Sequence, residues 1–215
     1  ENVVGNLNTW KKIHESRGNE CRYITYFSSK YGFPDDICLN LPFVAPTPLF
    51  INLRRAIYTL LSGPKNTKLL DGYPAEWEPN SKLIKLFFKT RDWLWKYKIE
   101  PAIKNYGLYN FDIYHLETGL GLYRNGKFIN SIAKLKKPIF NTFHGIELRY
   151  RGVITPIDKH VHINFTSEID LLSRHPKIKY LPLPFDVKLY TKNEKTIQKK
   201  ITICHTTRNR HFKGS

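Results

Sequence analysis

The second half of the chain alternates short apolar runs with segments in which apolar residues recur at helical spacing. Four runs rich in β-branched and aromatic residues predict strands, and two of the segments between them predict helices. The strands are expected at 111–115, 138–143, 161–165 and 178–181, and the helices at 127–135 and 167–174, the second one capped by Ser167. Strands that alternate with helices in this way predict a mainly parallel sheet covered on both faces.

The chain begins with a helix–glycine–strand pattern. Residues 5–17 are expected to form a helix that ends at Gly18, because glycine readily takes the left-handed conformation found after a helix. Residues 20–27 are rich in β-branched and aromatic side chains and predict a strand, and a second short strand is expected near 36–39. The pattern is typical of doubly wound α/β folds.

Two more helices are expected in the middle of the chain. One covers 49–61, and the other runs from residue 82, capped by Ser81, to about residue 99. Pro101 is expected to kink or restart this second helix, because proline lacks the backbone N–H that the helix needs. The sequence as a whole therefore predicts an α/β fold: a Rossmann-like, doubly wound domain with a mainly parallel sheet.

Charge narrows the choice of partner. The chain of 215 residues carries a net charge of +17 and has a sequence pI near 9.8, so an anionic partner is expected: nucleic acid, an anionic membrane surface or a phosphorylated substrate. The three cysteines, Cys21, Cys38 and Cys204, and the scattered histidines show no spacing typical of a metal site or of a disulfide framework. We therefore predict no metal site, and a cytoplasmic location fits these thiols.

Candidate ligand-binding residues follow the predicted strands. In an open parallel sheet, ligands bind at the carboxyl ends of the strands. His144 and Gly145 come directly after one strand; the glycine would let the backbone approach a ligand, and the imidazole could donate to a sugar hydroxyl or a phosphate. Arg149 and Arg151 could add charge-assisted hydrogen bonds. The alternative is that His144 only caps the strand and Arg149 is solvated.

Glu117 follows another predicted strand. It stands two residues after His115, and the two could act as an acid/base pair. Such residues are more often exposed loop groups, and this second interpretation is the one the sequence favours.

A basic loop ends the sequence. Arg210 and Lys213 could bind a diphosphate with help from the backbone around Gly214, or the segment is simply a basic tail. It follows a charged linker and a short apolar strand, so we expect residues 1–190 to form one domain and residues 191–215 to be the linker, first strand and phosphate loop of a second, incomplete domain. The first strand of the first domain is expected to be missing.

Several segments resemble, in the same order, those of bacterial glycosyltransferases of the GT-B fold, group 1 (family 4) type. The sequence from His205 to Ser215 resembles the segment I-x-H-A-P-T-N-R-x-x-K-G-T, and 111–115 resembles the strand F-D-I-x-H. Residues 141–149 resemble the loop x-x-H-G-x-D-x-R, with Glu147 in place of the usual aspartate, and 180–186 resemble the crossover L-P-N-P-V-D.

The resemblance implies roles for individual residues. His144 would be the catalytic residue, and His144 and Gly145 would face the reaction cleft near the acceptor and the transferred sugar. Glu117 and Arg149, the candidates named above from the residues themselves, are added as further substrate-binding residues. It also implies that Gly5 and Asn6 lie in the first loop beside the donor, and that the donor diphosphate is bound by Arg210, Lys213 and Gly214. Fixed cations there would stabilise the charge on the leaving phosphate.

The function expected from this resemblance is transfer of a sugar from a nucleotide-sugar co-substrate to a glycan or lipid-linked acceptor in envelope or exopolysaccharide synthesis. No cofactor and no metal are expected, and the sequence given is expected to be inactive alone. Nucleic acid is not an expected partner under this hypothesis. The alternative is a basic α/β module that binds nucleic acid or an anionic membrane without catalysis.

Members of this fold that associate with membranes have a basic first domain, so the protein is expected in the cytoplasm or peripherally on the inner face of the cell membrane. The helix from Lys82 to Lys98, with interleaved aromatic residues, is the segment expected to bind the interface. The alternative, which we favour from the sequence, is that Phe87, Phe88, Trp93 and Trp95 lie in the core and the lysines on the solvated face.

Overall fold

The computed structural model describes residues 5–29, 31–44, 52, 74–79, 81–145 and 147–185. The chain divides into two units, Glu1–Phe185 and Asp186–Ser215, and all of the described residues lie in the first unit. The second predicted domain, with its linker, strand and loop, lies outside the described residues. So does the helix predicted over 49–61, apart from Asn52.

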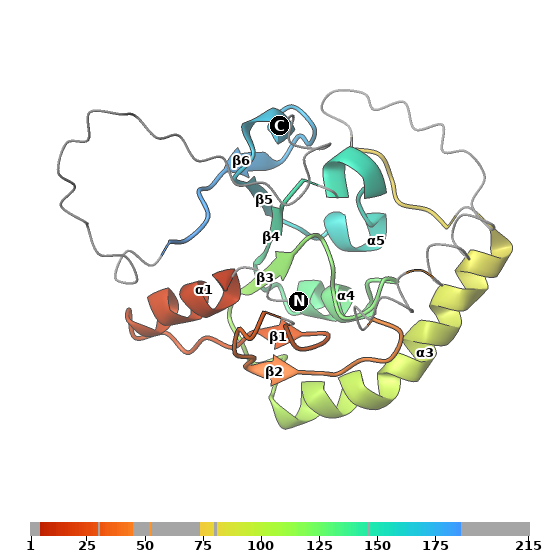
Figure 1. Cartoon of the computed structure of the whole chain (residues 1–215), viewed down its shortest axis with the longest axis horizontal. Coiled ribbons are helices and arrows are strands. Elements are labelled where there is room, and N and C mark those ends of the chain that lie inside the picture. Colours follow the sequence, from red (N-terminus) through yellow and green to blue (C-terminus); the bar gives the residue numbers. More distant parts are fainter. Residues whose placement is uncertain are drawn as a thin grey trace, which may run out of the picture. The chain divides into compact units, whose positions relative to one another are not determined.

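Four parallel strands form the main sheet of the first unit (Figure 1). They pair in the order in which they occur along the chain, β3-β4-β5-β6. Their bounds are Tyr114–Glu117 for β3, Ile139–Phe143 for β4, Ile163–Thr166 for β5 and Ile178–Tyr180 for β6. The predicted parallel sheet is thus confirmed, and the α/β architecture is consistent with a Rossmann-like fold.

A second, two-stranded sheet pairs β1 (Ile24–Thr25) with β2 (Ile37–Cys38), again in parallel. Among the described residues, four α-helices accompany the two sheets. They are α1 (Asn6–Glu15), α3 (Lys82–Asn105), α4 (Lys127–Lys134) and α5 (Thr155–Asp158). A π-helix follows β4 at Glu147–Arg151, and a 3₁₀ helix follows β5 at Ile169–Leu171.

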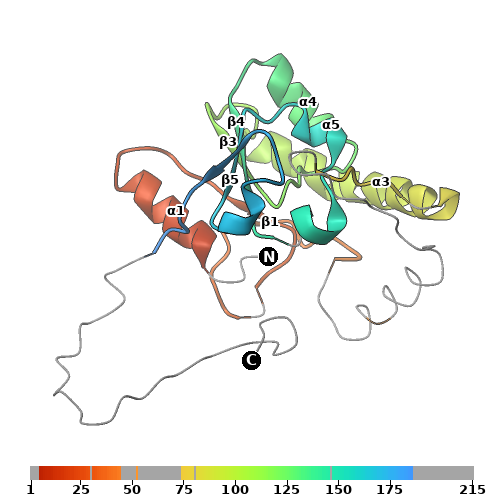
Figure 2. The same cartoon turned by 90° about the horizontal axis from the view of Figure 1, so that it is seen from above.

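Helices lie on both sides of the main sheet (Figure 2). Leu116 of β3 and Ile139 of β4 point to the main hydrophobic core, where they join buried residues of α3, α4 and α5. On the other face, the ring of Trp10 from α1 meets the ring of His115 edge-on, with 6.0 Å between the ring centroids. Side chains of adjacent strand residues point to opposite faces, so β3 contributes to both packing layers.

Helix α3 continues through Pro101 to Asn105 without the restart that the sequence offered as one of two outcomes at this proline. A proline at this position cannot donate to the carbonyl of Tyr97, four residues earlier. Tyr97 is 66% exposed, so water can satisfy that carbonyl. On the opposite side of the helix, Ile99, Ala102 and Ile103 are buried in the main core, and this packing holds the helix together across the proline.

The prediction of a helix over 167–174 was wrong. The segment forms only the short 3₁₀ helix, which begins after Glu168 and not after the predicted cap, Ser167. Leu171 is its only fully buried residue. A single buried side chain provides no apolar stripe for a full helical turn to pack against, and the segment instead turns back directly into β6.

Two arginines stack on aromatic rings at α3: Arg91 within the helix itself, and Arg124 between Phe88 of the helix and Trp77 outside it. Arg91, which is buried, lies 3.9 Å from the ring centroid of Trp95 and is paired with Asp92 at 2.7 Å. Arg124 lies 4.5 Å from the ring of Trp77. Cations stacked on aromatic faces in this way stabilise a packed surface while keeping the charge paired. Trp95 thereby belongs to the inner side of α3, as the core interpretation predicted for this residue.

Buried amides join β3, β4 and β5 beneath the carboxyl end of the sheet. Asn141 of β4 pairs in register with Asn164 of β5, and the Asn141 side chain donates to the Asn164 amide oxygen at 2.8 Å. The Asn141 amide oxygen accepts from the backbone N–H of Gly119 at 2.7 Å. Asn164 lies in turn within hydrogen-bonding distance of His175, which contacts Asp158 at 3.1 Å. The loop after β3 is therefore fixed to the neighbouring strands.

We predict that Asn141→Ala destabilises the domain by about 2–4 kcal/mol, because it leaves two buried polar groups without partners, each costing about 1–3 kcal/mol. Urea denaturation monitored by circular dichroism measures this. Asn130→Ala provides the matched control, because Asn130 is exposed on α4, and it should change the free energy of unfolding by less than about 0.5 kcal/mol. Equal effects of the two variants would contradict the structural role of the buried amide.

Candidate functional site

The carboxyl ends of β3 and β4 bring together Glu117 and His144. Glu117 is the last residue of β3, and His144 directly follows β4. Because these strands are neighbours in a parallel sheet, the two side chains meet, and Nε2 of His144 hydrogen-bonds to the carboxylate of Glu117. The side chains are 32% and 30% exposed, so the pair is accessible from solvent.

The pair keeps His144 protonated over a wider pH range than a free histidine. The hydrogen bond that His144 donates to Glu117 raises the pKa of His144 and outweighs the lowering effect of burial. The negative charges of Glu117, Glu147 and Glu168 act in the same direction. A nearby carboxylate favours the charged imidazolium, and the arrangement supplies a cationic hydrogen-bond donor beside a carboxylate.

Glu117 leads into a strained turn. Its carbonyl accepts from the N–H of Leu120 at 3.2 Å, and the two central residues, Thr118 and Gly119, have φ angles of +61° and +66°. Two positive φ angles are typical of a type I′ turn. Glycine adopts such angles without strain, whereas a β-branched threonine adopts them only at an energetic cost. Backbone strain of this kind occurs preferentially at functional sites.

The π-helix after β4 stabilises this turn. The carboxylate of buried Glu147 accepts from the backbone N–H of His144 at 3.1 Å, and the guanidinium of Arg151 donates to the carbonyl of Thr118. The charge of Glu147 also acts on Arg151, whose pKa is lowered by burial. Glu117, His144, Glu147, Arg151 and Thr118 thus form a ring of polar interactions around the carboxyl ends of β3 and β4. In this ring Glu147 and Arg151 are linked by the attraction of their charges alone.

Sequence reasoning identified most of these residues but not how they pair. It linked Glu117 to His115, its neighbour in sequence, and assigned Arg151 to a ligand. The structure pairs Glu117 with His144, 27 residues away. The guanidinium of Arg151 donates to the backbone carbonyl of Thr118. The order of parallel strands was the signal that could have shown the first pairing, because consecutive strands place their last residues side by side.

His115 has a different environment. Its Nε2 lies 2.7 Å from the hydroxyl of Thr142, and its ring meets those of Trp10 and Phe165. Although His115 is exposed to solvent, desolvation by its neighbours lowers its pKa. The pKa values of the two histidines are therefore shifted in opposite directions. The shift favours the neutral form of His115 and the charged form of His144.

Arg149 is held by acidic side chains of the next loop. Its Nη2 lies 2.5 Å from Glu168 and 2.7 Å from Asp170, and these two carboxylates raise its pKa. Gly145, at φ +116°, makes this possible, because a Cβ at that position would come within 2.2 Å of Nη1 of Arg149. The predicted role of Arg149 in binding a substrate would thus compete with two ion pairs.

Gly5 and Asn6 begin helix α1. Gly5 is buried with φ +73°, and a Cβ there would come within 3.0 Å of the ring of Phe33. Asn6 is the first residue of the helix, which has no acidic residue in its first turn. The predicted residues Arg210, Lys213 and Gly214 lie outside the described residues.

Other kinds of site have little support in the described part of the chain. It contains no group of three or more histidine, cysteine or carboxylate side chains that could hold a metal ion. Among its helices there is likewise none with the length and apolar character needed to cross a membrane.

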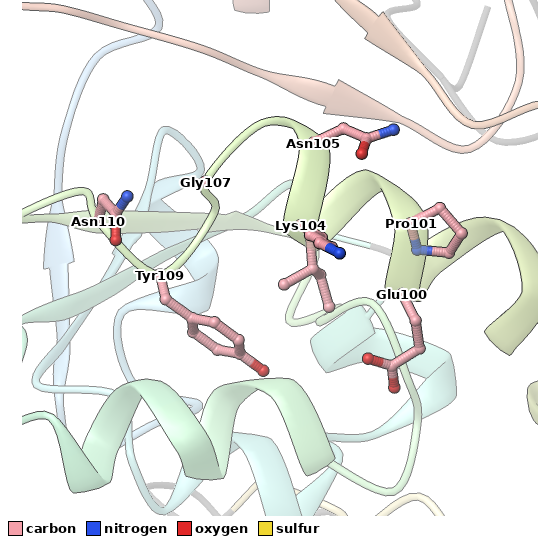
Figure 3. A pocket seen from close by; sticks show the side chains of 8 residues that line it. Glu100, Pro101, Lys104, Asn105, Gly107, Tyr109 and Asn110 are labelled. Atoms are coloured by element: carbon pink, nitrogen blue, oxygen red, sulfur yellow. The ribbon is translucent and has the colours of Figure 1, made fainter.

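A pocket of about 730 Å³ lies at the end of α3, away from the Glu117–His144 pair (Figure 3). It is open and is lined by residues of the α3 end and the following turn, among them Glu100, Lys104 and Tyr109. This turn precedes the amino end of β3, whereas Glu117 is at the carboxyl end. Glu100 is already paired with Lys127 at 2.8 Å. The pocket is therefore not the predicted site.

Comparison of the chain with protein-family models, with curated proteins and with solved structures found no match.

The raised pKa of His144 predicts a pH-dependent contribution to stability. Because the folded-state pKa exceeds that of the unfolded chain, the contribution is complete below about pH 6.5, the ordinary histidine value, and is lost as the pH rises through the folded-state pKa. We expect His144→Gln to destabilise the protein at pH 5.5 by about 0.5–1 kcal/mol more than at pH 9, the range for a partly exposed ion pair. Urea unfolding at the two pH values measures the difference.

Glu117→Gln gives the matched control for this prediction. It should remove the same pH-dependent component, and the double variant should lose no more of that component than either single variant, because both substitutions break one interaction. Additive pH-dependent losses would mean that the two side chains stabilise the domain independently.

Proposed function

We propose that this chain forms the acceptor side of a nucleotide-sugar-dependent glycosyltransferase of the GT-B type, which transfers a sugar to a glycan or lipid-linked acceptor. The observation that carries the proposal is the Glu117–His144 pair at the carboxyl ends of two adjacent parallel strands. This is the edge at which open α/β sheets bind their ligands. The ordered resemblance of the sequence segments supplies the reaction class.

Glycosyl transfer breaks the bond between the anomeric carbon and a phosphate oxygen and forms a bond from that carbon to the acceptor oxygen. The bonding electrons leave with the phosphate, and the proton of the acceptor hydroxyl passes to the departing phosphate oxygen. A fixed cationic donor that meets the developing negative charge lowers the barrier. The imidazolium of His144 has this character, because Nε2 faces Glu117 while the other ring nitrogen, Nδ1, can donate to a sugar or phosphate oxygen.

Glu117 acts through His144 in this proposal. Its carboxylate orients the imidazole and maintains the positive charge by raising the pKa of His144. The hydrogen bond from the backbone of His144 to Glu147 fixes the other side of the residue. The donor diphosphate would be bound by Arg210 and Lys213, in the part of the chain for which a nucleotide-binding role is expected.

A donor screen tests the proposal. The protein encoded by the complete reading frame would be incubated with UDP-, GDP-, ADP- and dTDP-sugars and a membrane lipid extract, and the released nucleoside diphosphate would be measured between pH 6 and pH 9. We expect turnover with at least one donor, and a loss of about 100-fold or more in kcat/KM for His144→Gln, the typical effect of removing one donor to a developing charge. Activity should fall as the pH rises through the raised pKa of His144.

Glu117→Gln distinguishes catalysis from a structural role. Removing this carboxylate lowers the pKa of His144, so the fall in activity at high pH should move to lower pH, which a purely structural defect would not produce. His160→Gln is the control, because His160 lies outside the ring of polar interactions, and its pH profile should match that of the wild type. Absence of both turnover and sugar-nucleotide binding by saturation-transfer NMR would refute the proposal.

A further inference from the structure

Helix α3 has two apolar sides rather than one. Its inner side is buried in the domain and comprises Ile84, Arg91, Trp95, Ile99, Ala102 and Ile103. The other side also carries large apolar residues, but these are exposed to solvent. Their exposed fractions are 61% for Leu83, 58% for Leu86, 48% for Phe87, 57% for Trp93 and 66% for Tyr97. The core interpretation drawn from the sequence is therefore wrong for Phe87 and Trp93.

The exposed residues form a strip along the helix, with exposed Thr90 between Leu86 and Trp93. Leu83, Leu86, Trp93 and Tyr97 are separated by three, seven and four residues, which places them on one side of an α-helix. At a rise of about 1.5 Å per residue the strip is about 21 Å long. The rings of Trp93 and Tyr97 pack against each other, with 5.5 Å between their centroids. Large exposed apolar side chains gathered on one side of a helix point to a site of interaction.

A row of lysines borders the strip. Lys82, Lys85, Lys89 and Lys96 follow the same helical spacing one position away, and all four are exposed. The two acidic residues of the helix do not offset this charge. Asp92 is paired with Arg91 at 2.7 Å, and Glu100 is paired with Lys127 at 2.8 Å. The outer surface of α3 therefore combines large apolar side chains with unbalanced positive charge.

This combination selects among the possible partners. A second copy of α3 would bring lysine rows close to one another, and like charges in contact oppose association. Nucleic acid would satisfy the lysines, but its phosphate backbone would leave Leu83 and Leu86 exposed to water. An anionic lipid bilayer satisfies both features, since leucine and aromatic side chains enter the boundary between headgroups and acyl chains while lysines contact anionic headgroups.

We infer that the outer side of α3 is a docking surface for an anionic lipid bilayer. The helix lies in the plane of the interface, with the strip from Leu83 to Tyr97 inserted and the inner side still packed in the domain. This inference does not depend on the proposed enzymatic function, because it rests on α3 and the function rests on the Glu117–His144 pair.

Vesicle co-sedimentation tests the docking surface. The full chain would be mixed with phosphatidylcholine vesicles that contain either no anionic lipid or about one third phosphatidylglycerol, at low and high salt. We expect binding to the anionic vesicles that weakens as salt rises, because the lysine contribution is screened. Leu86→Ser with Trp93→Ser, and separately Lys85→Glu with Lys89→Glu, should each weaken the apparent Kd at least about tenfold.

Matched variants elsewhere on the surface control for general loss of apolar area or charge. Ile113 and Ile169 are 61% and 74% exposed and lie outside α3, so their double serine variant should bind like the wild type. The same is expected of Lys134→Glu with Lys159→Glu, which changes exposed lysines of other elements. Circular dichroism of each variant confirms that the fold is retained.

Three results would overturn the inference. These are no binding to anionic vesicles, binding that the α3 variants do not weaken, and a concentration-dependent dimer in light scattering that the Leu86→Ser and Trp93→Ser variant abolishes. An RNA or DNA affinity that exceeds vesicle binding at the same salt and depends on Lys85 and Lys89 would likewise assign the surface to nucleic acid. Trp93 offers a direct readout, since quenching by brominated lipid should decrease in Trp93→Phe.

Discussion

The buried hydrogen bond between Asn141 and Asn164 is the constraint on which the site depends. It joins β4 to β5 in register and, through the N–H of Gly119, fixes the turn after β3. A polar pair inside a sheet is costly unless every donor and acceptor is satisfied, and a slip of one residue would expose both amides to apolar neighbours. The pair therefore specifies which residues reach the carboxyl edge together, including Glu117 and His144.

The ring of polar interactions at that edge stabilises the strained backbone of Thr118. Thr118 holds a positive φ angle because its N–H donates to Thr142 at 2.8 Å and its carbonyl accepts from Arg151. The positive charge of Arg151 is in turn favoured by Glu147, whose carboxylate accepts from the backbone N–H of His144. Each member restrains the next, and a ligand that contacts His144 thus meets a preorganised group rather than a mobile side chain.

The periodicity of the sequence was sufficient to predict the parallel sheet, the helices α1 and α4 and the start of α3 at Ser81. Each of these follows from local pattern and capping. It was insufficient where tertiary packing decides. The continuation of α3 through Pro101 depends on the burial of Ile99 and Ile103. The segment after β5 forms a short 3₁₀ helix instead of the predicted α-helix because so little of it is buried. His144 and Gly145 could be identified because they follow a strand. Pairing His144 with Glu117 required the order of the strands in space.

Helix α3 shows the same limit from another direction. A helix with apolar residues on two sides gives no sequence signal for which side meets the core, so Trp93 and Trp95 look alike in the sequence. The structure separates them, because Trp95 lies under Arg91 and inside the domain while Trp93 is exposed. The pattern of apolar residues in the sequence shows that a side of the helix is apolar, but it does not show what covers that side.

The Glu117–His144 site and the outer side of α3 differ in how their charges are paired. The net charge of +17 does not accumulate at the Glu117–His144 site, where Arg149 is paired with Glu168 and Asp170 and Arg151 interacts with Glu147. On α3, by contrast, the exposed lysines face no acidic residue of their own helix that is not already paired. Long-range attraction to an anionic surface therefore arises from the helix, whereas the site contributes a short-range donor, His144, whose charge is maintained by one carboxylate. A phosphate-bearing ligand at the site would consequently need cations from outside the described residues, and this is the role assigned above to Arg210 and Lys213.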